Sequence, residues 1–120
     1  FGEALQTNTA MTELVLADNA IGDAGAVALG EALKQNNVLM TLNLYKNRIG
    51  DSGAAALAEG LRVNRVLTEL ILEENSIGDA GAKALADALK MNSNSNLASL
   101  AMNNNRVGNI GAAAFAEALK

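Results

Sequence analysis

The side chains best suited to acid–base chemistry in this 120-residue chain are carboxylates, because it contains no histidine and no cysteine. The most suggestive pair is Glu73 and Glu74. Adjacent residues on a strand point in opposite directions, however, so they do not form a general acid and base pair. Without His and Cys, thiol catalysis, disulfides and zinc sites of the usual ligand set are also excluded. We therefore expect a protein that is not an enzyme and needs no cofactor.

The charge balance narrows the range of partners. Nine basic residues stand against thirteen acidic ones, and no basic run could neutralise a phosphate backbone, so we expect no nucleic acid partner. Acidic segments could supply oxygen ligands for calcium, but the chain has no D-x-D-x-D-G loop. No apolar run approaches ~18 residues, so we expect no membrane span. The absence of cysteine and of Asn-x-Ser/Thr acceptor sites favours a cytoplasmic location.

One leucine pattern recurs four times and organises the whole chain. The Leu-x-x-Leu-x-Leu core begins at Met11, Leu39, Leu67 and Leu97, at offsets of 28, 28 and 30 residues. We place the repeats at 11–38, 39–66, 67–96 and 97–120, preceded by a partial helix at 1–6. We interpret 1–120 as a single domain and as a fragment of a longer array, because neither end has a polar capping unit. Uncapped ends could also allow two copies to associate.

Each repeat predicts a strand, a turn and a helix. Leu14, Val15 and Leu16 alternate with period two, whereas Leu29 and Leu33 lie at helical spacing. Helix starts are predicted from N-cap residues, which are Asp23, Asp51, Asp79 and Asn109. Helix ends are predicted from residues that tolerate the left-handed conformation, which are Asn8, Asn36, Asn64 and Asn92. The turns between strand and helix are also expected to need a left-handed backbone, which glycine adopts most easily. Their glycines are Gly22, Gly50, Gly78 and Gly108.

Two repeated rows are interpreted as scaffold. Amides that satisfy the backbone groups of the turn are expected at Asn19, Asn47, Asn75 and Asn105. Opposite charges three residues apart on the outer helix face should pair, as Glu31 with Lys34, Glu59 with Arg62, Asp87 with Lys90, and Glu117 with Lys120. The two extra residues in the stretch 93–96 predict a local bulge.

Positions that vary between repeats are not dictated by the fold and should face the concave side. As partner-binding candidates we select Glu13, Val15, Asp18, Asn43, Tyr45, Lys46, Glu69, Ile71, Glu73, Glu74, Asn103 and Asn104. The other variable positions there are Ala17, Thr41, Ser99 and Ala101. The set contains five acidic residues and one basic residue, so we expect a protein partner with a neutral to basic surface and Tyr45 as its best anchor. Alternatively, these acids merely keep an open sheet soluble.

The unit LxxLxLxxNxIGDxGAxALAxAL resembles the ribonuclease-inhibitor-like class of leucine-rich repeats over the whole chain. The variant with IGDAGA at 21–26 is most similar to the arrays of NOD-like receptors. The resemblance implies an α/β horseshoe solenoid of about four repeats, with parallel strands on the concave face and helices on the convex face. It also implies a protein-interaction module, with a ligand-sensing or autoinhibitory segment, a GTPase-activating scaffold or an inhibitor scaffold as alternatives.

Overall fold

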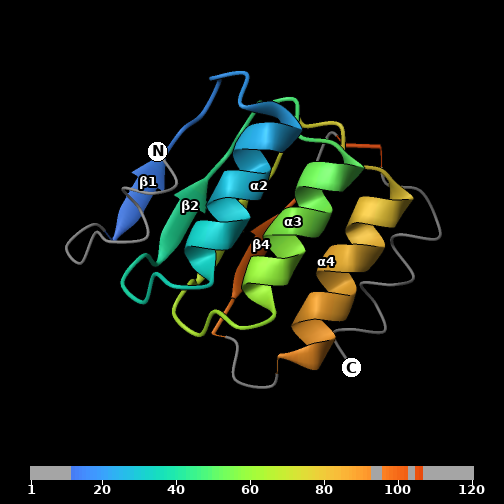
Figure 1. Cartoon of the computed structure of the whole chain (residues 1–120). Coiled ribbons are helices and arrows are strands. Elements are labelled where there is room, and N and C mark those ends of the chain that lie inside the picture. Colours follow the sequence, from blue (N-terminus) through green and yellow to red (C-terminus); the bar gives the residue numbers. More distant parts are fainter. Residues whose placement is uncertain (1–11, 93–95, 103–104, 107–120) are drawn as a thin grey trace.

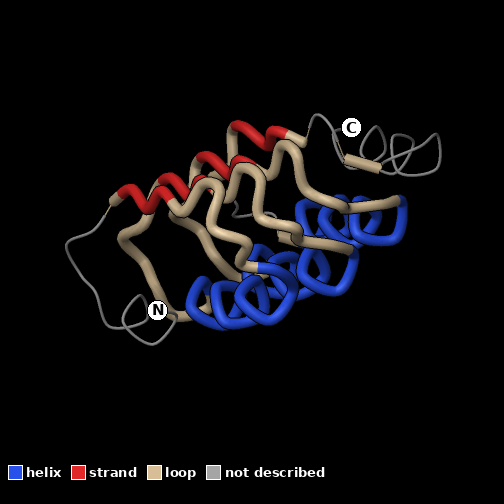
Figure 2. Tube along the Cα trace, turned by 90° about the horizontal axis from the view of Figure 1, so that it is seen from above, coloured by secondary structure: helices blue, strands red, loops and turns tan. Residues whose placement is uncertain are grey.

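The computed structural model describes residues 12–92, 96–102 and 105–106. In this part of the chain, three-residue strands alternate with helices. They are β1 (Glu13–Val15), α2 (Gly22–Leu33), β2 (Thr41–Asn43), α3 (Asp51–Leu61), β3 (Glu69–Ile71), α4 (Asp79–Met91) and β4 (Ser99–Ala101). The strands pair in chain order as a parallel sheet, and the helices lie side by side along it (Figure 1). Strands form one layer and helices the other (Figure 2), which confirms the predicted solenoid.

The strand register separates the leucine core from the outer face of the sheet. Leu14 pairs with Leu42, which pairs with Leu70, and all three side chains are buried against the helices. The residues before and after each of these leucines point to the opposite side, because successive side chains of a strand alternate. Each fully buried leucine contributes about 1.5–3 kcal/mol. The fold therefore rests on aliphatic side chains stacked from repeat to repeat.

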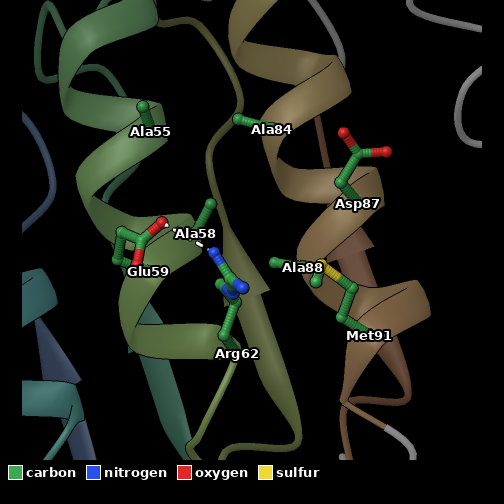
Figure 3. Close-up of a pocket in the computed structure, with 8 residues that line it drawn as sticks. All are labelled: Ala55, Ala58, Glu59, Arg62, Ala84, Asp87, Ala88 and Met91. Carbon is green, nitrogen blue, oxygen red and sulfur yellow. Dashed lines mark hydrogen bonds and ion pairs between the residues drawn. The ribbon is translucent and has the colours of Figure 1, made fainter.

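Two glycines bring the backbones of α2 and α3 into contact. A Cβ added to Gly30 would lie 2.2 Å from the Ala56 carbonyl oxygen, and one added to Gly60 would lie 2.6 Å from the Gly30 carbonyl oxygen. The corresponding residues at the contact between α3 and α4 are Ala58 and Ala88. A groove of about 260 Å³ lies between these two helices, with alanine side chains from both helices in its lining (Figure 3).

The aspartates predicted as N-caps act on the next helix rather than on their own. Asp51 is the first residue of α3, and no side chain caps that helix from its own N-cap position, which is Gly50. Instead, Asp23 Oδ1 in α2 accepts hydrogen bonds from the Gly50 and Gly53 amides, at 2.7 and 2.9 Å. The prediction was wrong about the partner because intervals within one repeat cannot show contacts made across 28 residues.

Asp51 repeats this arrangement one unit later. Its Oδ1 accepts from the Gly78 and Gly81 amides at the start of α4, at 2.7 and 2.9 Å. A Cβ at Gly81 would lie 2.8 Å from the same oxygen, which explains the glycine at this place in the motif. Asn109, the fourth predicted N-cap, lies outside the described residues.

The asparagines predicted to close the helices lack a left-handed backbone, and the side chains of Asn64 and Asn92 bond to the end of the helix in the preceding repeat. Asn92 has φ −98°, and the described residues with positive φ do not include Asn36 or Asn64. Asn64 Nδ2 donates to the carbonyl of Leu33, the last residue of α2, at 2.9 Å. Its Oδ1 accepts from the Leu67 amide at 2.8 Å. The side chain, not the backbone conformation, makes asparagine useful here. Asn8 lies outside the described residues.

The glycine prediction for the turns holds at one described position. Gly22 has φ +70°, but Gly50 and Gly78 have φ −106° and −102°. These latter values are open to other residues, so a left-handed turn was the wrong reason for their glycines. Gly108 lies outside the described residues, as do positions 93–95 of the predicted bulge.

The asparagine row forms a ladder of buried amides, as predicted. Asn75 Oδ1 accepts from the amides of Asn47 and Ile49 in the preceding repeat, at 3.0 and 2.9 Å. Its Nδ2 donates to the carbonyls of Leu44, Leu72 and Glu73. Asn47 makes the corresponding bonds to the first repeat, whereas Asn19 is exposed. The amide therefore connects each repeat to the one before it.

Candidate protein-binding surface

The outer side of the sheet carries the predicted variable residues of the strands. We call this surface the strand face, and it consists of Glu13, Val15, Thr41, Asn43, Glu69, Ile71, Ser99 and Ala101. The register aligns them in two rows across the sheet. All are exposed or half-buried, and Val15 is 54% exposed. As expected from the sequence, these side chains lie on the side of the sheet that faces away from the helices (Figure 2).

The remaining described candidates lie beyond the strands, in the loops that lead to the helices. These loops hold Ala17 and Asp18, then Tyr45 and Lys46, then Glu73 and Glu74. Backbone bonds fix each loop to the next one: the Asp18 amide donates to the Tyr45 carbonyl at 2.8 Å, and the Lys46 amide to the Glu73 carbonyl at 3.0 Å. Asn103 and Asn104 lie outside the described residues.

Charged residues occupy a left-handed backbone position in each of these loops. Asp18, Lys46 and Glu74, which are equivalent in the three repeats, have φ of 57°, 58° and 55°. Arg48 also has a positive φ, of 62°. This conformation costs a residue with a Cβ roughly 1–2 kcal/mol. Sequence reasoning missed it because it sought positive φ at glycine and asparagine.

Tyr45 is held against the acidic loop that follows it. Its hydroxyl donates a hydrogen bond to the Glu74 carboxylate of the next repeat. That bond and the negative charge of Glu74, together with the charges of Glu73 and Asp18, raise the pKa of Tyr45 above its usual 10.0. The ring is half-buried. Tyr45 therefore presents a fixed apolar edge and also orients a carboxylate.

The loops enclose a charged hollow, which we call the loop hollow. Its volume is about 230 Å³, and it is lined by Asp18, Ala20, Lys46, Arg48, Glu74 and Ser76. Sequence analysis selected three of these but missed Ala20, Arg48 and Ser76. These three share one repeat position and differ in chemistry, which is the signal that could have found them.

Charges on the helix side are arranged differently, because there they pair within a helix. Ion pairs join Glu31 to Lys34 and Glu59 to Arg62, as predicted; the second is visible in Figure 3. Asp87 pairs with Lys83 at 3.0 Å and not with Lys90 as expected. Lys83 replaces the Val27 and Ala55 of earlier repeats and offers a cation one turn before Asp87.

The described residues contain no group of three or more side chains suited to hold a metal ion. None of the described helices has the length and apolarity needed to cross a membrane.

Comparison with known proteins identifies the class to which this chain belongs. The family model described as Leucine Rich repeat matches residues 7–30, 35–58, 63–86 and 93–116. These segments begin 28, 28 and 30 residues apart, as the leucine pattern does. The chain therefore belongs to the leucine-rich repeat family. A search of curated protein sequences finds no significant match.

Two solved structures show the same fold over nearly the whole chain. One is titled Leiomodin-1 Actin-Binding Site 2; it has a TM-score of 0.88 and 30% identity and covers 98% of this chain and 69% of its own. The other is the tropomodulin C-terminal domain of Caenorhabditis elegans, with a TM-score of 0.84 and 18% identity, covering 98% and 72%. The second likeness shows the fold alone.

Proposed function

We propose that this chain is a non-catalytic module that binds a protein partner of neutral to basic surface through the strand face and the loops beside it. The proposal is supported by a difference between the helix side and the strand side in whether acidic side chains form ion pairs. On the helix side Glu31, Glu59 and Asp87 form ion pairs, whereas Glu13, Glu69 and Glu73 form no ion pair with any residue that the structure describes. Acids without partners attract a complementary surface.

The available area also informs the proposal. Four strands about 4.8 Å apart, each presenting about four residues, offer roughly 250 Å², against about 800 Å² per partner in a standard interface. The loop residues extend this area, and Tyr45 gives it a half-buried aromatic group of the kind enriched at interface hot spots. We therefore expect weak binding from this chain alone.

The test compares two variants with equal changes in charge. Replacing Glu13, Glu69 and Glu73 with Gln, which we call the strand-face variant, removes two charges from the strand face and one from the loop beside it. Replacing Glu31 and Glu59 with Gln and Asp87 with Asn removes three charges from the helix side. Proteins captured from a cell extract by the wild type should be retained by the helix-side variant and lost by the strand-face variant. Equal retention by both variants would contradict the proposal.

The finer family assignment belongs to the same proposal. The repeat length of 28 residues and the IGDAGA segment at 21–26 support the ribonuclease-inhibitor-like class, with the NOD-like receptor type of array within it. A cytoplasmic module with a ligand-sensing, autoinhibitory, inhibitory or GTPase-activating role would fit this class. The GTPase-activating alternative is tested by adding the chain to a purified GTPase of the Ran type and measuring GTP hydrolysis.

A second candidate function is actin binding, which is favoured by the 30% identity to the leiomodin-1 site over 98% of this chain. Titration of purified monomeric actin with the chain in a calorimeter tests it. Heat that saturates and disappears with the strand-face variant would support actin as the partner of that surface. No heat at micromolar concentrations of both proteins would remove this candidate.

A further inference from the structure

The loop hollow contains two cations at repeat positions that carry other residue types in the neighbouring repeats. Lys46 and Arg48 are exposed, and neither forms an ion pair with any described residue. Both have a left-handed backbone, but so do their equivalents Asp18, Glu74 and Ala20, so the loop sets this conformation whatever the side chain. The backbone therefore does not dictate a cation at either position, and two cations in one hollow can attract a partner of complementary charge.

The walls of the hollow determine what these cations could bind. Asp18 and Glu74 occupy the repeat positions on either side of Lys46, so the row reads acid, base, acid. Glu74 is also oriented by the Tyr45 hydroxyl. A free phosphate or a nucleic acid backbone would be attracted by the two cations but repelled by both carboxylates. A ligand with one carboxylate between two cations would match the row, because its carboxylate would face Lys46 and its two cations would face Asp18 and Glu74.

A protein segment can supply this pattern. Neighbouring strands lie ~4.8 Å apart, so the three positions of the row span about 10 Å. Alternate residues of an extended peptide point to the same side, and three of them span about 13 Å. Flexible lysine and glutamate side chains can accommodate the remaining ~3 Å. We propose that the loop hollow selects a partner segment in which an acidic residue stands between two basic residues at alternate positions.

This inference rests on the proposed protein-binding function and specifies its partner. The probes are three labelled peptides, GKAEAKG, GKAKAKG and GEAKAEG, whose binding to the intact chain is measured by fluorescence anisotropy. We expect the wild type to bind GKAEAKG about fivefold more tightly than GKAKAKG, since each exposed ion pair gained or lost changes binding by up to about 1 kcal/mol. The difference should shrink as salt is added.

The double variant Lys46→Glu/Arg48→Glu should reverse this preference and bind GKAKAKG more tightly. The control Lys34→Glu/Lys83→Glu makes the same change in charge on the helix side and should keep the wild-type preference. Lys46→Ala/Arg48→Ala, with circular dichroism as a folding check, should abolish the preference if the reversed variant does not fold. Equal or tighter binding of GKAKAKG by the wild type, a preference that survives Lys46→Ala/Arg48→Ala, or no binding of any peptide would each overturn the inference.

The two proposals fail in different experiments. The strand-face variant leaves every residue of the loop hollow intact, so it should keep the peptide preference even where it loses partner capture. Capture that survives in that variant counts against the strand face, whereas loss of capture without any peptide preference counts against the loop hollow.

Discussion

At the scale of single residues, Tyr45 shows how one side chain joins two repeats of the outer surface. Its backbone belongs to the loop after β2, whereas its hydroxyl partner Glu74 belongs to the loop after β3. The strands themselves connect through backbone bonds, whereas this bond joins two exposed side chains and orients the Glu74 carboxylate. The position of that carboxylate decides which charges of a partner can approach the surface.

The raised pKa of Tyr45 leads to a direct measurement. The chain has one tyrosine and no tryptophan, so the absorbance of tyrosinate reports Tyr45 alone. We expect the folded protein to titrate with a midpoint above 10.0, because the Glu74 bond and charge favour the protonated hydroxyl. A pKa raised in the folded state contributes stability below the unfolded value, and this stability is lost as the pH rises through the folded pKa.

The matched control for this titration is Glu74→Gln. This variant keeps a hydrogen-bond acceptor but removes the charge, so the midpoint should fall toward 10.0. Glu31→Gln on the helix side should leave it unchanged. A wild-type midpoint at or below 10.0 would show that the bond between Tyr45 and Glu74 does not persist in solution.

At the scale of elements, each helix depends on side chains from neighbouring repeats for its ends. The amides at the start of α3 bond to Asp23 in α2, and the last carbonyl of α2 accepts from Asn64 in the loop after α3. Backbone groups at helix ends have no partners within the helix, so these contacts fill a requirement that a single repeat cannot meet alone. Neighbouring helices therefore stabilise each other through their ends as well as through their sides.

The dependence of α4 on Asp51 is testable. Asp51→Ala should lower the free energy of unfolding by about 1 kcal/mol, the usual cost of losing an N-terminal cap. Amide exchange should accelerate at Gly78 and Gly81 in the next repeat, while Gly50 and Gly53, which Asp23 caps, keep their protection. Ser52→Ala, on an exposed neighbouring residue, serves as the control and should change neither property. Faster exchange confined to α3 would show that Asp51 caps its own helix.

Whether a feature could be predicted from the sequence depends on how far apart along the chain the contacting residues lie. Periodicity within one repeat was sufficient to predict the strands, the helices and the outward position of residues such as Glu69 and Asn43. The partners of Asp23 and Asn64 could not be found in this way, because they lie one repeat away. The left-handed backbone at Lys46 and Arg48 gave no signal in residue type. The charged hollow built on that backbone was therefore only partly predictable.

At the scale of the whole molecule, the asparagine ladder couples the repeats into one stack. A solenoid contacts only nearest neighbours, so its stability is close to a sum of repeat terms and interface terms. The amide of Asn75 connects two such units by five hydrogen bonds to their backbones. Its removal would leave buried donors and acceptors without partners, each at a cost of about 1–3 kcal/mol.

We therefore expect Asn75→Ala to destabilise the stack strongly. Urea unfolding should show a loss of about 3 kcal/mol or more, accompanied by a broader transition as the repeats on either side become less coupled. Asn19→Ala makes the same change at an exposed amide, whose described side-chain bond runs to the Ala17 carbonyl within the same repeat, and should cost less than about 1 kcal/mol. If both variants lost a similar amount of unfolding free energy, the buried asparagine side chains would not be what couples adjacent repeats.

The capping of each helix by an adjacent repeat has a consequence for how such an array can grow. A gene duplication of 28 codons, wherever its boundaries fall, recreates every junction, because each aspartate again precedes its glycine amides by the same interval. Insertions of other lengths within a helix or strand would shift donors away from acceptors, whereas the bond from the Ile77 amide to Asn105 forms across the 30-residue interval as well. Such an array can therefore gain whole repeats without losing these hydrogen bonds. The loop residues can then vary while the contacts between repeats stay the same.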